Sequence, residues 1–160
     1  LIIISGCAEY GSAKIFPSEK YAYISYLLIN KNYHILLIGS VNDITVNQKI
    51  NKFTKNKCFD ITGKTSLAEC IDVISCAQYF LSNDSGLMHI AAALNVPQDS
   101  FFGSSDPKNT PPLNNKAIVN YLNLDCSPCF ERQCPLKHFD CMNKIDEKEI
   151  SKRIICLLNK

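Results

Sequence analysis

One short segment of the chain combines residue types that suit a bound anion. Asn83, Asp84, Ser85 and Gly86 follow an apolar run and open a helical pattern. Backbone amides at a helix start are unpaired, and a glycine lets a ligand approach them, so this turn predicts a phosphate site. Because Asp84 would repel phosphate, we expect its carboxylate to accept from sugar hydroxyls while Ser85 and Gly86 face the anion. The alternative is that Asp84 or Ser85 only caps the helix.

A lysine in an earlier loop offers a matching positive charge. Lys14 lies beside Gly11 and Ser12, after the first apolar run, and a flexible ammonium there can neutralise a diphosphate; otherwise it is a solvated surface residue. The chain has no Asp-x-Asp pair, which disfavours a carboxylate-held metal, so we expect no cofactor for chemistry. His89 falls one turn beyond Ser85 and could face the same crevice, although a lone histidine on an apolar helix more often packs.

Four of the nine cysteines crowd into residues 126–141, with His138 among them. Their spacing is C-x2-C-x4-C-x6-C, and the four candidate thiolate ligands for a structural zinc are Cys126, Cys129, Cys134 and Cys141. The alternatives are an iron–sulfur cluster, one or two disulfides, or a loop of partly buried thiols. In each case we expect this cysteine-rich segment to pin a long loop and to take no part in catalysis.

The other five cysteines are scattered along the chain. Cys7 stands in a loop, whereas four lie in apolar patterns, which predicts buried thiols in a reducing cytosol: Cys58, Cys70, Cys76 and Cys156.

These residues must be positioned by alternating strands and helices. Strands are expected near residues 1–5, 34–38, 58–62, 79–82, 96–102 and 117–121. Five helices are expected. The first begins at Ser18, the second follows Gly39-Ser40 and ends near Lys55, the third runs from Ser66 to about Cys76, the fourth covers 87–94, and the fifth follows Asp146. Short loops between them predict βαβ units, hence an α/β, doubly wound, Rossmann-like parallel sheet with helices on both faces. Ligands of such folds bind beyond the carboxyl ends of the strands, which points to loops 6–17, 39–43, 63–66 and 83–86.

Composition and charge limit the class of protein to which the chain can belong. The chain has 160 residues, of which 46% are hydrophobic and 20% charged, as in ordinary globular domains. A net charge of +2 is too small to indicate a nucleic-acid partner or an acidic membrane surface. The chain opens without Met on a strand-like run, so we expect it to be the C-terminal part of a longer protein.

Several motifs together resemble the ADP-heptose glycosyltransferases, glycosyltransferase family 9. They occur in the family's order: Ala8-Glu9-Tyr10-Gly11-Ser12-Ala13-Lys14, Gly39-Ser40, Gly63-Lys64-Thr65-Ser66-Leu67, the block from Asn83 to Leu94, Phe102-Gly103-Ser104-Ser105, Thr110-Pro111-Pro112-Leu113 and the cysteine-rich segment. The resemblance covers essentially the whole chain. It implies the C-terminal half of a GT-B glycosyltransferase, with residues 1–160 as one donor-nucleotide domain and the N-terminal acceptor domain absent from the sequence.

The resemblance also implies roles for individual residues. Lys14 would hold the diphosphate with Glu9 and Tyr10 beside it, Asp43 would lie near the ribose, and Lys64 and Thr65 would pass the adenine. Phosphate and heptose would meet Asp84, Ser85, Gly86 and His89. The chemistry implied is inverting transfer of heptose from ADP-heptose to the lipopolysaccharide inner core, Kdo-lipid A bearing heptose. That reaction places the enzyme in the cytoplasm, at the inner face of a Gram-negative inner membrane that it contacts through its acceptor.

In the family, the general base lies in the N-terminal domain, so we expect this chain to bind donor without turnover. Two other functions stay open: a GT-B glycosyltransferase using another nucleotide sugar, and a non-catalytic nucleotide-binding module stabilised by metal.

One segment departs from the family pattern. Val96-Pro97 should lead into an apolar strand, yet Gln98, Asp99 and Ser100 follow. Unpaired polar groups in a buried strand cost roughly 1–3 kcal/mol each. The sequence therefore predicts either a shifted register here or a copy that is drifting.

Overall fold

A computed structural model describes residues 1–6 and 9–159; Cys7 and Ala8, which open the first family motif, lie outside the described residues. Six parallel strands form one sheet in the order β3-β2-β1-β4-β5-β6. Their bounds are β1 Ile2–Ser5, β2 Ile35–Leu37, β3 Phe59–Asp60, β4 Tyr79–Asn83, β5 Gln98–Phe101 and β6 Ala117–Asn120. The predicted Rossmann-like parallel sheet is confirmed.

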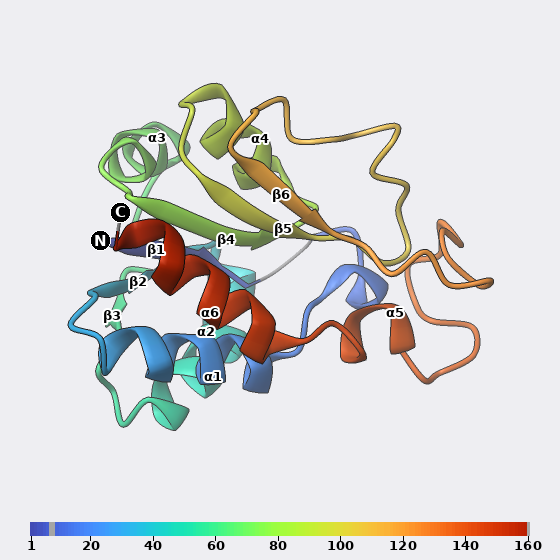
Figure 1. Ribbon diagram of the computed structural model, residues 1–160, viewed down its shortest axis with the longest axis horizontal. Coiled ribbons are helices and arrows are strands. Elements are labelled where there is room, and N and C mark those ends of the chain that lie inside the picture. Colours follow the sequence, from blue (N-terminus) through green and yellow to red (C-terminus); the bar gives the residue numbers. More distant parts are fainter. Residues whose placement is uncertain (7–8, 160) are drawn as a thin grey trace.

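Helices cover both faces of this sheet (Figure 1). One face carries α1, α2 and α6, with bounds Ser18–Ile29, Ile44–Phe53 and Glu147–Leu158; the other carries α3 (Leu67–Ser75) and α4 (Gly86–Ala93). Shorter elements are η1 (Ser12–Lys14), η2 (Val41–Asp43) and α5 (Asp140–Asn143). Among the described residues, no helix is long and apolar enough to cross a membrane.

Two of the helix starts are capped by side chains. Ser66 and Glu69 form a reciprocal capping box at α3, and the Asp146 carboxylate accepts from the amides of Lys148 and Glu149 at α6. Such caps pair backbone N–H groups that otherwise lack a partner inside the helix. They hold the pKa of Glu69 and of Asp146 below the usual range.

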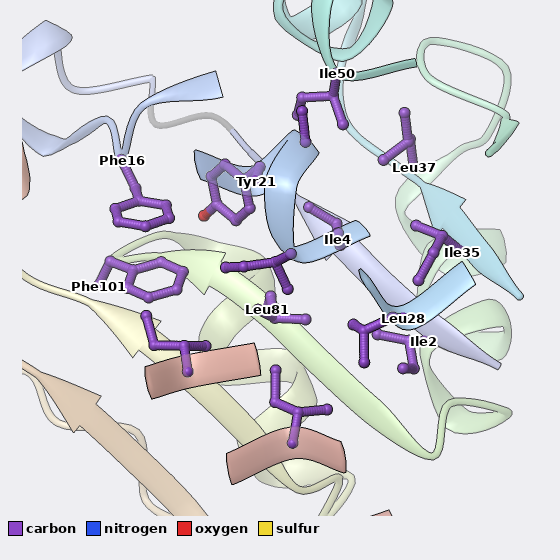
Figure 2. Packing of buried hydrophobic residues seen from close by; sticks show 14 of the residues in the cluster. Ile2, Ile4, Phe16, Tyr21, Leu28, Ile35, Leu37, Ile50, Leu81 and Phe101 are labelled. Carbon is purple, nitrogen blue, oxygen red and sulfur yellow. The ribbon is translucent and has the colours of Figure 1, made fainter. Parts of the chain in front are cut away.

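The apolar residues of β1 alternate between the two faces. Ile2 and Ile4 belong to the core beneath α1, α2 and α6 (Figure 2), whereas Ile3 belongs to the core beneath α3 and α4. At one end of the first core Phe16 stacks on Phe101, with ring centroids 4.1 Å apart. This contact fixes the loop after β1, which carries Lys14, against β5.

The polar residues of β5 do not shift the strand. Phe80 pairs with Gln98 and the register continues without interruption to Asn83 and Phe101. Gln98 donates to the carbonyl of Met88 at 3.3 Å, and Ser100 donates to Gln98 at 3.3 Å. Since the ladder is uninterrupted, the predicted register shift is wrong. The buried polar side chains can lie within the strand because they have hydrogen-bond partners.

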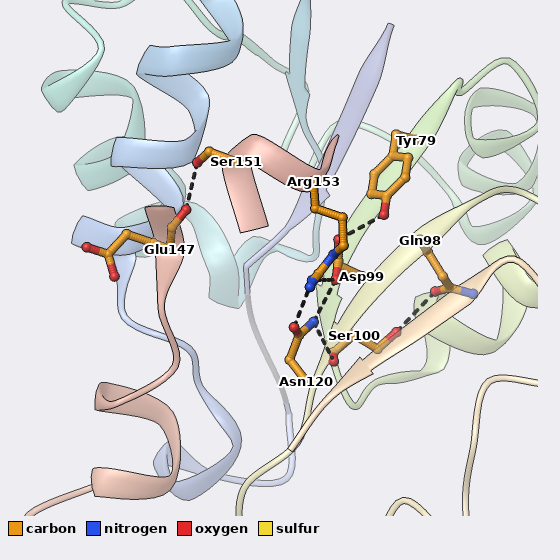
Figure 3. A network of polar contacts seen from close by, with 8 residues as sticks. All are labelled: Tyr79, Gln98, Asp99, Ser100, Asn120, Glu147, Ser151 and Arg153. Carbon is orange, nitrogen blue, oxygen red and sulfur yellow. Dashed lines mark hydrogen bonds and ion pairs between the residues drawn. The ribbon is translucent and has the colours of Figure 1, made fainter. Parts of the chain in front are cut away.

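Asp99, fully buried, is the centre of the largest such set of partners (Figure 3). It accepts from the Tyr79 hydroxyl at 2.8 Å and from Asn120 Nδ2 at 2.7 Å, and it pairs with Arg153 of α6. Burial, and then the neighbouring charge of Asp99, raise the pKa of Tyr79 far above its ordinary value. The network ties the closing helix to the sheet.

The scattered cysteines divide differently from the expectation. Cys58 and Cys70 are buried, but Cys76 and Cys156 are exposed, so the prediction of a buried thiol is wrong for these two. Cys76 is the C-cap of α3, beyond its packed face. Cys156 lies on α6, whose buried residues are Ile150, Ser151 and Ile154; two positions past Ile154 the helix faces solvent.

Candidate functional site

A cavity of about 740 Å³ lies at the carboxyl ends of β1, β2 and β4. Its walls come from the loops that follow these strands and from the first turns of α3 and α4. Nine of the ten residues predicted to bind donor line it: Glu9, Tyr10, Lys14, Asp43, Thr65, Asp84, Ser85, Gly86 and His89.

The tenth predicted residue lies elsewhere. Lys64 is exposed, does not line the cavity, and donates from Nζ to the carbonyl of Asp60 at 3.1 Å. Gly63, just before it, has a φ of +71°, and its amide bonds the carbonyl of Gly39 at 2.9 Å. This turn brings Thr65 to the cavity and leaves the Lys64 side chain outside.

Lys14 is held in place by Asp84. Its Nζ lies 2.5 Å from Asp84 Oδ2, which also accepts from the Ser105 hydroxyl at 2.6 Å. Both side chains of the ion pair are mostly shielded, with 17% and 7% exposure for Lys14 and Asp84. The pair therefore fixes an ammonium at the wall of the cavity, a position from which it can meet an anion.

Asn83 is a supporting residue that the sequence reasoning missed. Its side chain is fully buried, accepts from the Phe16 amide at 2.9 Å and the Tyr21 hydroxyl at 3.1 Å, and donates to the Gly6 carbonyl at 2.9 Å. It thus connects β4 to both ends of the loop that carries Lys14. A buried amide before Asp84 was visible in the sequence, but its partners, 62 to 77 residues away, were not.

The start of α4 leaves polar groups available to a ligand. Ser85 occupies the N-cap position but its side chain makes no capping bond, and among the described residues its buried Oγ has no partner. A Cβ added at Gly86 would meet no atom within 4 Å. The helix therefore presents its first amides to the cavity, beside an unpaired hydroxyl and open space.

Asp43, which also lines the cavity, is hydrogen-bonded within its own loop. Its Oδ2 accepts from the Ser40 amide at 2.6 Å and from the Ser40 hydroxyl at 3.1 Å, closing a capping box at η2. A Cβ at Gly39 would lie 2.5 Å from that oxygen, so glycine is needed there for the loop to close. This geometry fixes the orientation of the carboxylate at the cavity wall.

An apolar wall, also missed from the sequence, completes the cavity between α3 and α4. It consists of Leu67, Cys70, Leu87 and Ile90. The Thr65 hydroxyl lies 3.1 Å from Cys70 Sγ at its edge. The helical spacing of these positions was the signal available, but spacing does not reveal which exposed face borders a cavity.

The cysteine-rich segment surrounds a second, much smaller cavity of about 20 Å³. All four of its thiols line it, together with Ala13, Ser104 and His138. Burial, followed by the charges of the other three thiols, raises the pKa of the Cys141 thiol. Among the described residues, no three His, Cys, Asp or Glu side chains are arranged to hold a metal ion. As placed, the thiols form no metal site among the described residues, so zinc there stays a prediction.

Comparison with known proteins identifies the family. The model of glycosyltransferase family 9 (heptosyltransferase) matches residues 1–140. Lipooligosaccharide heptosyltransferase 2 of Haemophilus influenzae is 40% identical over 123 residues, covering 73% of this chain and 36% of the relative. Lipopolysaccharide heptosyltransferase 2 of Escherichia coli K12 is 39% identical over 116 residues, covering 70% and 33%. The chain thus matches about a third of the length of these curated relatives.

Solved structures agree with this assignment. E. coli ADP-heptose lps heptosyltransferase II superposes with a TM-score of 0.72 at 31% identity, covering 90% of this chain and 45% of that one. Two others share the fold at lower identity: E. coli WaaC with ADP (TM-score 0.67, 18%, coverage 96% and 42%) and the iron-containing TibC of enterotoxigenic E. coli with ADP-D-beta-D-heptose (0.74, 19%, 99% and 45%). This chain belongs to glycosyltransferase family 9, the heptosyltransferases.

Proposed function

We propose that this chain binds ADP-heptose, and that the enzyme containing it transfers the heptose to the inner core of lipopolysaccharide. The observation that carries the proposal is the 740 Å³ cavity, which both the Lys14 ammonium and the uncapped start of α4 line. The names of the relatives and the nucleotide in the WaaC and TibC structures support it.

Each end of the cavity suits one part of the donor. Lys14 and the first amides of α4, beside Ser85 and Gly86, hold the diphosphate; Glu9 and Tyr10 border it. The sugar hydroxyls of the heptose meet Asp84 and His89. At the other end Asp43 takes the ribose, and Thr65 with the apolar wall takes the adenine. Lys64 has no part in this arrangement, since its side chain lies outside the cavity.

The reaction requires two kinds of assistance. Negative charge grows on the diphosphate as ADP departs, and Lys14 with the α4 amides is placed to stabilise it. The acceptor hydroxyl must lose its proton to a nearby carboxylate during the inverting attack. We assign that base to an N-terminal acceptor domain, and residues 1–160 to a single donor domain that includes the cysteine-rich loop 126–141.

The proposed chemistry needs no cofactor, because the lysine and the helix start supply the positive potential. A structural zinc at the four thiols is a separate proposal, supported by the cavity that they share. The thiols would have to move together to bind it, so no step of the mechanism is derived through a metal. Metal analysis of the purified chain tests this proposal.

The acceptor determines where the enzyme works. Kdo-lipid A bearing heptose is a lipid, so we propose that the enzyme is cytoplasmic and contacts the inner face of the inner membrane only through this substrate. A nucleic-acid partner is not proposed, since the net charge of the chain is only +2.

Calorimetric titration of ADP and UDP into the wild-type chain and a Lys14→Ala variant tests the function. We expect saturable ADP binding, preference for ADP over UDP, and about tenfold or greater weakening without Lys14, the size of one charge-assisted contact. Equal binding of UDP would favour a different nucleotide sugar. Stoichiometric metal without nucleotide affinity would favour a non-catalytic module.

A further inference from the structure

The cysteine-rich segment lies directly against the loop that carries Lys14 (Figure 1). The Ala13 amide donates to the Arg132 carbonyl at 3.1 Å, and the Tyr10 hydroxyl donates to the Phe130 carbonyl at 3.0 Å. A Cβ at Gly11 would lie 2.3 Å from the Arg132 carbonyl oxygen, so the two backbones touch. The contact surface on the Lys14 loop therefore spans Tyr10 to Ala13.

Hydrogen bonds also join the cysteine-rich segment to the turn after β5. The Phe130 amide donates to the Ser104 carbonyl at 2.7 Å, and the Ser127 hydroxyl donates to the Gly103 carbonyl. The next residue of this turn, Ser105, holds Asp84, the partner of Lys14. The segment thus bridges the two loops that set the position of the Lys14–Asp84 pair.

This bridge places the Arg132 side chain beside the cavity. The Arg132 guanidinium carbon lies 5.0 Å from the centroid of the Tyr10 ring, and Lys14 Nζ lies 4.9 Å from the same centroid. Tyr10 lines the cavity, and an aromatic ring holds a cation over its face by electrostatic attraction. Arg132 is exposed and forms no ion pair with any residue that the structure describes.

The charges that line the cavity do not suit a diphosphate unaided. Lys14 is the one Lys or Arg among the described lining residues, whereas three carboxylates line it: Glu9, Asp43 and Asp84. A diphosphate brings further negative charge to the end where Lys14 is already paired with Asp84. An unpaired guanidinium one ring away is suited to offset that charge, because its planar fork matches phosphate oxygens.

We propose that Arg132, held over Tyr10 by the cysteine-rich segment, is a second cationic binding group for the diphosphate of the donor. The proposal rests on the donor site described above. It gives the segment a role in substrate binding, whereas the sequence suggested only that it pins a loop.

Titration of ADP, adenosine and inorganic pyrophosphate into wild type and Arg132→Gln tests this role. The variant retains the backbone contacts of residue 132 and loses the positive charge together with the guanidinium fork. We expect ADP and pyrophosphate to bind about five- to tenfold more weakly, as for one lost charge-assisted contact, with adenosine unchanged. Arg132→Lys, which keeps the charge but not the fork, should fall between the two.

The matched control is Lys137→Gln, which removes one exposed positive charge from the same segment. It should leave all three affinities within about twofold of wild type, since Lys137 neither lines the cavity nor lies over the Tyr10 ring, and a more distant exposed charge is screened by salt. Unchanged ADP affinity in Arg132→Gln, equal weakening of ADP and adenosine, or an equal effect of Lys137→Gln would overturn the proposal. If pyrophosphate binding depends on Arg132 but ADP binds no more tightly than pyrophosphate, the donor assignment is contradicted and the anion site stands. If none of the three probes binds, both proposals are overturned.

Discussion

The protein's own packing does not require a glycine at position 86. A Cβ there would meet nothing within 4 Å, and alanine favours a helix by up to about 1 kcal/mol over glycine. A bound phosphate at the start of α4 would occupy that open space. We therefore expect Gly86→Ala to melt at or slightly above the wild-type temperature and to bind ADP about tenfold more weakly in calorimetry.

Gly103→Ala is the matched control for this substitution. A Cβ at Gly103 would lie 2.9 Å from Cys141 Sγ and 3.2 Å from Met142 Cγ, so the added methyl should destabilise the fold by about 1–3 kcal/mol. Gly86→Ala that binds ADP as tightly as wild type would show that the ligand does not approach this glycine.

Single residues of the site were predictable to different degrees. Ser85 and Gly86 could be selected from the sequence because helix-start chemistry is local: strand, turn and helix follow within a few positions. Lys64 could not be separated from Thr65, because the direction of adjacent side chains depends on the turn at Gly63. The position of Arg132 depends on a contact with Tyr10 across more than a hundred residues, which no local pattern encodes.

Among the elements, β5 shows most clearly how distant partners alter an interpretation. Gln98, Asp99 and Ser100 read as defects in a buried strand, since the sequence does not show where Tyr79, Asn120 and Arg153 will lie. The six strands themselves were predictable, because short β-branched runs between helical patterns are a local signal. To predict that Cys76 and Cys156 are exposed, the ends and faces of their helices must be known more precisely than the pattern of apolar residues allows.

The Asp99 network predicts the stability of the closing helix. Arg153→Met would leave the buried Asp99 carboxylate without its charge partner, and removal of one partner from a buried pair costs about 3–5 kcal/mol. Because the Arg153 side chain is 33% exposed, we expect a smaller loss in the free energy of unfolding, about 2 kcal/mol, measured by urea denaturation.

Lys152→Met, on the exposed side of the same helix, is the control and should change stability by less than about 0.5 kcal/mol. In the double variant Asp99→Asn, Arg153→Met, part of the lost stability should return because no unpaired charge stays buried. Equal effects of Arg153→Met and Lys152→Met would show that the ion pair contributes nothing to attachment of α6.

For the whole molecule, the topology decides where chemistry can occur. Helices cover both faces of the parallel sheet, so a ligand can bind beyond the carboxyl ends of the strands. There the loops that follow β1, β2 and β4 converge on a cavity. That location followed from the alternation of elements alone. The size of the cavity, its apolar wall and the bridge made by the cysteine-rich segment depend on tertiary packing and had to come from the structure.

The same arrangement predicts donor binding without transfer by residues 1–160. A transfer step needs a carboxylate free to take the acceptor proton, but Asp84 already holds Lys14 and Ser105, and Asp43 holds Ser40. Glu9 is the remaining carboxylate among the described lining residues, on the exposed loop after β1. Because we assign the base to a second domain, mixing the chain with ADP-heptose and a heptose-bearing Kdo-lipid A should release no ADP above the uncatalysed rate. Acceptor-dependent ADP release that is lost in Glu9→Gln would place the base in this domain and contradict its assignment to a second one.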